Sequence, residues 1–80
     1  MEQRQRPANW ASYAEGMMKA AEQKAKAGQV EEAIAGYLMA ADIFLTLAKS
    51  ESTYRAWLDY ATKAELCQKK VKELMAGGQG

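Results

Sequence analysis

Histidine is absent from this 80-residue chain, and cysteine occurs once, at Cys67. A zinc site of Cys and His ligands, a Ser-His-Asp triad and a Cys-His dyad therefore cannot be assembled within the chain. A single cysteine cannot form an internal disulfide, which fits a reducing compartment. We expect no catalytic residue, no metal and no cofactor.

Excess charge and long apolar runs are also missing. Lys plus Arg number 11 and Asp plus Glu number 10, so the formal net charge is +1 and nothing draws the chain to nucleic acid. The most apolar stretch, residues 33–48, is interrupted by Asp42 and is shorter than the roughly 20 residues of a membrane span. We expect a cytoplasmic domain without nucleic-acid binding or membrane insertion.

Proline occurs once, β-branched residues are few, and alanine is the most frequent residue, a composition that favours helix over strand. Asn9 can cap a first helix and Gly28 can end it, while Ser50 and Ser52 are candidate caps for a third. The spacing of apolar residues predicts helices at about residues 9–27, 30–48 and 52–75. Flanking these, we expect a flexible arm over residues 1–8 and a flexible tail or linker over residues 77–80.

The short connections between these helices predict antiparallel neighbours. The expected fold is all-α: an up-down-up three-helix bundle over residues 9–76, with tetratricopeptide-like packing of the first two helices. Trp10 and Trp57 lie on the predicted core stripes and should anchor the bundle, and Cys67 should be buried in the seam of the third helix. The second helix carries a further apolar stripe beside its core face: Gly36, Met39, Ile43 and Leu47.

Two segments resemble a known family. Residues 19–34 contain Lys-Ala-Ala-Glu and then Lys-Ala-Gly-Gln-Val-Glu-Glu-Ala-Ile, followed by Tyr37, Ala40 and Phe44. Residues 57–61 read Trp-Leu-Asp-Tyr-Ala, and Val-Lys-Glu-Leu follows at 71–74. Over roughly residues 10–75 the chain resembles the MIT domain (microtubule interacting and trafficking), a three-helix bundle at the N-terminus of the AAA ATPases that disassemble ESCRT-III polymers. A short segment between the second and third helices favours an archaeal version.

The resemblance implies a function as a noncatalytic interaction module. MIT domains bind C-terminal tail motifs of ESCRT-III subunits and so recruit the attached ATPase to membrane-associated polymers in scission, trafficking or cell division. A helical motif lies between the second and third helices, against a leucine that matches Leu58 and a small residue that matches Ala61. The family often has a glutamate where this chain has Thr62, so Glu65 is the candidate replacement. The implied groove residues are Met39, Ile43, Leu47, Tyr54, Leu58, Ala61, Thr62 and Glu65.

A second groove, between the first and third helices, takes an extended, proline-containing motif in some members of the family. Met18 occupies the position of a contact residue there. The candidate residues on this side are Tyr13, Met18, Lys63 and Lys70. The domain itself is expected to be a monomer, whereas the parent protein can be oligomeric.

Two other interpretations of the same residues stay open. The Glu-Glu-Ala-Ile pattern with Tyr37 also occurs in tetratricopeptide pairs, although such arrays repeat every 34 residues and this chain does not repeat. Alternatively, the further apolar stripe could bury itself against a second copy of the chain, which would make the domain a structural, self-associating one. An enzyme is a distant third, because Glu31 and Glu32 are adjacent in a helix and point about 100° apart.

Overall fold

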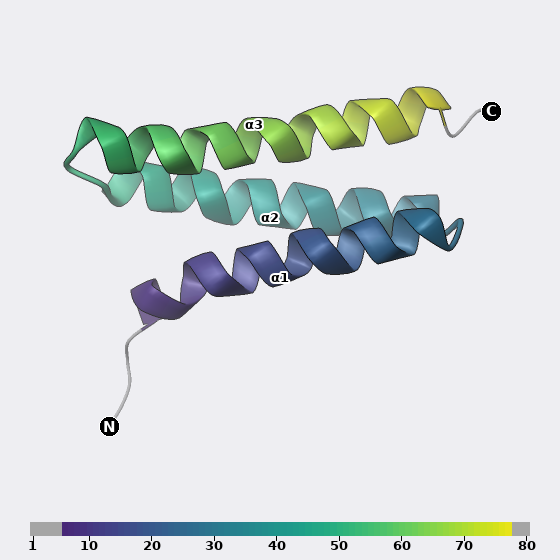
Figure 1. The fold of residues 1–80 in the computed structure, drawn as a ribbon, viewed down its shortest axis with the longest axis horizontal. Coiled ribbons are helices and arrows are strands. Elements are labelled where there is room, and N and C mark those ends of the chain that lie inside the picture. Colours follow the sequence, from purple (N-terminus) through teal and green to yellow (C-terminus); the bar gives the residue numbers. More distant parts are fainter. Residues whose placement is uncertain (1–5, 78–80) are drawn as a thin grey trace.

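The computed structural model describes the backbone of residues 6–77 and the side chains of residues 10–77, and in this part of the chain it contains three helices and no strand. They are α1 (Arg6–Lys26), α2 (Val30–Ser50) and α3 (Tyr54–Gly77). The helices run up, down and up, which confirms the predicted all-α antiparallel fold. Helix α2 lies between α1 and α3 and is set back from them (Figure 1), and the chain measures 45 × 30 × 12 Å. Helix α2 therefore packs against both neighbours.

The turn between α1 and α2 follows the predicted chemistry. Gly28 has a φ of 86°, in the left-handed region that glycine adopts without steric penalty. The amide of Gln29 donates to the carbonyl of Lys24 at 2.9 Å, which closes the end of α1. Across the turn, Lys24 Nζ and Glu32 Oε1 form an ion pair at 2.9 Å.

Other helix ends differ from the prediction. Helix α1 begins at Arg6, so the expected N-cap at Asn9 is wrong; Pro7 lies in the first turn, where its missing N–H is harmless. The cap of α3 is Thr53 rather than Ser50 or Ser52: its Oγ1 accepts from the amide of Ala56 at 3.3 Å. Ser50 instead donates to the carbonyl of Thr46 at 3.3 Å, as the last residue of α2. The rest of the predicted arm and tail, residues 1–5 and 78–80, lies outside the described residues.

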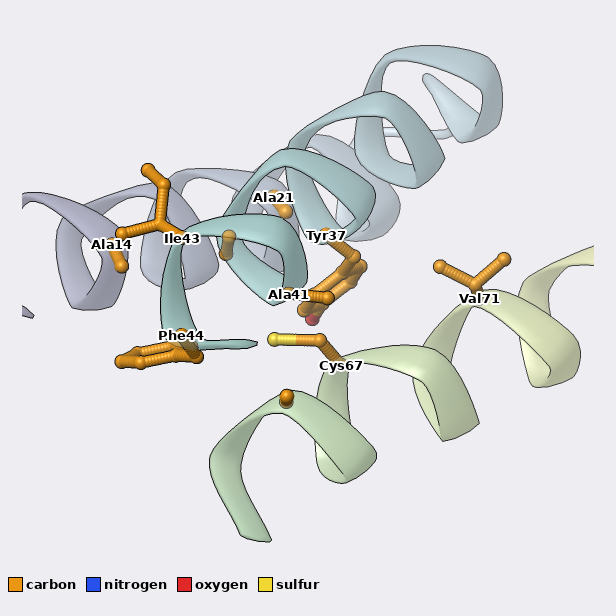
Figure 2. Close-up of a cluster of buried hydrophobic side chains, with 10 residues drawn as sticks. Ala14, Ala21, Tyr37, Ala41, Ile43, Phe44, Cys67 and Val71 are labelled. Carbon is orange, nitrogen blue, oxygen red and sulfur yellow. The ribbon is translucent and has the colours of Figure 1, made fainter. Parts of the chain in front are cut away.

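Helix α2 supplies most of the core (Figure 2). Phe44 is completely buried and stacks on Tyr60 of α3, with ring centroids 6.3 Å apart. Cys67 of α3 is also completely buried, as predicted for a small apolar residue in the seam. Small side chains make up much of the remaining core, which brings the helix axes close together. The buried apolar residues are Ala14, Ala21, Ala33, Tyr37, Ala40, Ala41, Ile43, Phe44, Ala48, Ala64, Cys67 and Val71.

The prediction that Trp10 and Trp57 anchor the core is wrong. Each is 42% exposed, and each contacts a neighbouring aromatic ring on its own helix. Trp10 meets Tyr13 edge-on with centroids 6.3 Å apart, and Trp57 stacks on Tyr54 at 5.8 Å. The outer helices each pack mainly against α2, so both tryptophans lie at the margins of the interfaces.

The contact between α1 and α2 depends on a glycine. A Cβ added at Gly36 would lie 3.1 Å from Cβ of Ala21 on α1, closer than side chains normally pack. A Cβ added at Gly16, on the exposed side of α1, would have no atom within 4 Å.

We therefore predict opposite effects for two glycine substitutions. Gly16→Ala should raise the free energy of unfolding by about 0.5–1 kcal/mol, because alanine lowers the conformational entropy lost on helix formation. Gly36→Ala gains the same propensity but forces α1 away from α2, so it should lower stability by about 1 kcal/mol. Chemical denaturation followed by circular dichroism measures both. An equal stabilisation by the two variants would show that α1 and α2 do not meet closely at Gly36.

Candidate peptide-binding site

A groove of about 490 Å³ lies between α1 and α3, and Tyr37 of α2 forms part of its floor. It exists because both outer helices pack on α2 and not extensively on each other. We call it the α1/α3 groove; its lining residues are Glu15, Met18, Lys19, Glu22, Tyr37, Lys63, Leu66 and Lys70. The surface that lines it is mainly apolar. Such a groove suits an apolar ligand with a few polar groups.

Lys63 connects the two outer helices at one end of this groove. Its Nζ donates to Glu15 Oε2 at 2.7 Å and lies 3.5 Å from Asp59 Oδ2. The same ammonium lies 5.8 Å from the centroid of the Phe44 ring, within reach of a cation–π interaction. The hydrogen bond to Glu15 raises the pKa of Lys63 above its usual 10.5, despite an opposing effect of burial. Lys63 therefore stays charged and links α3 to α1 at this end of the groove.

The same pair of residue types recurs seven residues along both helices, as Glu22 on α1 and Lys70 on α3. Because α1 and α3 run in the same direction, the second pair lies two turns beyond the first. No ion pair joins Glu22 to Lys70 among the described residues; Glu22 is 3.9 Å from Lys26 of its own helix instead. The two outer helices are therefore joined by an ion pair at Glu15 and Lys63 and not at Glu22 and Lys70.

Three of the four residues predicted for this side line the groove: Met18, Lys63 and Lys70. The fourth, Tyr13, is 56% exposed and contacts Trp10. Sequence reasoning missed Tyr37 and Leu66 as lining residues. The helical spacing of Tyr37 with Ala41 and Phe44 predicts a core position, and periodicity alone does not reveal that α1 and α3 leave a gap above it.

The expected groove between α2 and α3 is not assembled from the predicted α2 stripe. Gly36 packs on Ala21 of α1, and Ile43 points toward Ala14 of α1 (Figure 2). Ile43 is 8% exposed and belongs to the core, so the prediction that it lies on a further apolar stripe beside the core face is wrong. Ile43 and Leu47 line a notch of about 410 Å³ together with Trp10 of α1 and Tyr60 of α3. Met39, beside them, is 53% exposed.

The predicted α3 residues lie on its exposed side. Tyr54 is 72% exposed and Leu58 is 43% exposed, while Ala61 is half-buried. Thr62 and Glu65 line a shallow depression formed by α3 itself, with Leu66, Gln68, Lys69 and Lys72. The structure does not join these residues with Met39, Ile43 and Leu47 in one groove.

A different stripe of α2 lies on the α3 side. Tyr37, Ala41 and Phe44 face α3, and the next positions around the helix, away from α1, carry three apolar residues. We call Ile34, Leu38 and Leu45 the outer α2 stripe. Leu38 is 49% exposed and Leu45 is 40% exposed. Together with Ala41 these residues are spaced 4, 3 and 4 apart, which is typical of one face of a helix. The sequence alone does not show which neighbouring helix this face adjoins, because that depends on the position of α3.

The chain was compared with protein-family models, with curated proteins and with solved structures, and none of the three comparisons found a match. Within residues 6–77, no helix combines the length and the apolar character that crossing a bilayer requires. The described residues also contain no group of three or more Cys, Asp and Glu placed to hold a metal ion. Burial raises the pKa of the Cys67 thiol, which opposes formation of a thiolate.

The bond between Lys63 and Glu15 should give a small, pH-dependent stabilisation. Because the pKa of Lys63 is raised in the folded state, the contribution is complete below pH 10.5 and is lost as pH rises through the raised value. Both side chains are partly exposed, so we expect Glu15→Gln to lower the free energy of unfolding by roughly 0.2–1 kcal/mol at pH 7. Above the raised pKa, the variant and the wild type should converge.

Denaturation with urea at pH 7 and at a pH above the raised pKa of Lys63 measures this difference. Glu22→Gln is the matched control, because it removes the same charge from the same helix without an interhelical hydrogen bond. A deficit of Glu15→Gln that persists unchanged at the higher pH, or an equal deficit in the control, would contradict the assignment.

Proposed function

We propose that this chain is a noncatalytic interaction module that binds short C-terminal tail motifs of ESCRT-III-like subunits, as MIT domains do. In that role it recruits a fused AAA ATPase to membrane-associated polymers in the cytoplasm. The observation that carries the proposal is the α1/α3 groove, where Met18, Lys63 and Lys70 line one open, apolar depression. Met18 matches a contact residue of the MIT family on this side, and Lys63 and Lys70 are the predicted rim residues beside it.

The dimensions of the groove suit an extended peptide. From Glu15 to Glu22, α1 advances seven residues, which is about 10 Å of helix. An extended segment covers that distance in about three residues. Apolar side chains of the motif would contact Met18 and Leu66, and the charged rim would contact its flanking polar groups. A proline suits this environment because it has no N–H that the apolar walls would leave unpaired.

The affinity of such a contact should be modest. Three or four bound residues bury much less than the 1,200–2,000 Å² of a typical stable protein interface, so dissociation constants of about micromolar order are expected. Repeated motifs along a polymer would add avidity when several copies of the domain are held together.

The outer α2 stripe supports a second candidate, a helical motif on the α2/α3 side. Leu38 and Leu45 of α2 are at least 40% exposed, and Trp57 and Leu58 of α3 are exposed to a similar degree. An amphipathic helix could cover such a surface with its apolar face. A second copy of the chain could cover it too, which is the self-associating alternative.

Titration of the ¹⁵N-labelled domain with an extended, proline-containing tail peptide and with a helical tail peptide tests both candidates. We expect saturable shifts at Met18, Tyr37 and Leu66 with the extended peptide. Shifts at Leu38, Leu45 and Leu58 with the helical peptide would establish the second candidate. No saturable shift with either peptide at millimolar concentration would overturn the proposed function. Sedimentation at several concentrations then tests self-association.

Two leucines of α3 provide matched variants. Leu58 and Leu66 are both 43% exposed, but only Leu66 is among the residues that line the α1/α3 groove. Leu66→Asp should weaken binding of the extended peptide about tenfold or more, because it puts a charge on an apolar wall, and Leu58→Asp should leave it unchanged. Isothermal titration calorimetry measures the affinities, and thermal melts verify folding. Equal weakening by both folded variants would argue against this groove.

A further inference from the structure

Tyr37 combines deep burial with an unmet hydrogen-bonding group. Its side chain is 4% exposed, and it lines the floor of the α1/α3 groove. None of the described residues makes a hydrogen bond with its hydroxyl. Buried hydroxyl groups in native proteins are nearly always paired, because an unpaired one loses its bonds to water without replacement. A phenylalanine would fill the same core position without this penalty.

The surroundings of the hydroxyl make it a donor. Burial raises the pKa of the Tyr37 phenol, and the carboxylates of Glu22 and Glu73 raise it further, with a contribution from Cys67. In Figure 2 the hydroxyl oxygen lies at the end of the ring, on the side of Cys67. The phenol therefore keeps its proton at neutral pH and offers an O–H to whatever enters the groove. Its partner must be an acceptor.

The charges that act on the Tyr37 phenol indicate which acceptor fits. A carboxylate brought to Tyr37 would come close to Glu22, whose field already disfavours a negative charge on the phenol oxygen. A main-chain carbonyl is a neutral acceptor and meets no such repulsion. The apolar walls at Met18 and Leu66 accept the side chains on either side of that carbonyl.

We propose that the Tyr37 hydroxyl is the polar anchor of the α1/α3 groove and donates a hydrogen bond to a main-chain carbonyl of an extended peptide. This inference rests on the proposed function, because it assigns the chemistry by which the same groove holds its ligand. Tyr37 thereby fixes which residue of the motif lies between Met18 and Leu66. In the unliganded domain the hydroxyl does not stabilise the fold, so a phenylalanine at this position would give at least the same stability.

Tyr37→Phe tests the anchor, because it removes one oxygen and keeps the ring. We expect the variant to bind the extended tail peptide roughly threefold to tenfold more weakly, and to melt at the same or a higher temperature than the wild type. Tyr60→Phe is the matched control: Tyr60 is outside the groove lining, so its loss of a hydroxyl should leave the affinity unchanged. A lower melting temperature of Tyr37→Phe would reveal an internal partner and overturn the inference.

A backbone ester in the peptide identifies the acceptor. Replacing an amide by an ester weakens the carbonyl as an acceptor, so the ester at the anchored position should weaken binding to the wild type and have no further effect on Tyr37→Phe. Esters at other positions should weaken binding to both proteins equally. A set of esters with no such coupling at any position would overturn the inference.

The outcomes separate this inference from the proposed function. Equal binding of the tail peptide by the wild type and Tyr37→Phe would overturn the anchor and leave the interaction module intact. If neither tail peptide binds, the proposed function fails, and a panel of short proline-rich peptides of different charge is then titrated into both proteins. Binding that is weaker in Tyr37→Phe would support the anchor for extended peptides in general, and no shift at Tyr37 with any of them would overturn it.

Discussion

The packing of α2 against both of its neighbours is the constraint on which this structure depends. A central helix that contacts two others needs apolar residues on two adjoining faces, and α2 has them: Gly36 and Ile43 toward α1, Tyr37 and Phe44 toward α3. The outer helices bury their apolar faces against α2 and therefore make little contact with each other. The gap between them therefore results from the packing of both outer helices on α2. Tyr37 lies at the base of the gap because α2 forms that base.

Charged side chains at the rim then join the two outer helices at one end of that gap. The Glu15–Lys63 bond is made at one end, and its counterpart at Glu22 and Lys70 is not. Since an exposed ion pair contributes little to stability, the difference matters more for access than for folding. The end without the ion pair leaves the apolar walls at Met18 and Leu66 within reach of a chain that arrives from solution.

Helical periodicity was sufficient to predict the three helices, their antiparallel order and the burial of Cys67, because these follow from local spacing and from short connections. It was not sufficient to assign the faces of α2. Helical spacing is found both in the outer α2 stripe and in the set Met39, Ile43 and Leu47. Deciding which of the two borders α3 requires knowing on which side of the α1–α2 pair α3 lies. That choice is made by packing among all three helices. Trp10 and Trp57 were misplaced for a related reason, since outer helices that pack mainly on α2 bury less of their surface than the helices of a closed bundle do.

The sparse contact between α1 and α3 would also couple occupancy of the groove to folding. A molecule that fills the α1/α3 groove supplies the contact that the two outer helices lack, and it can do so only while α2 holds them in place. Such a ligand binds the native chain and not the unfolded one. By mass action it therefore raises the free energy of unfolding in proportion to the logarithm of its concentration once it is in excess. A ligand in this groove would act as a fourth element of the bundle, and its concentration would set how much it adds to the free energy of unfolding.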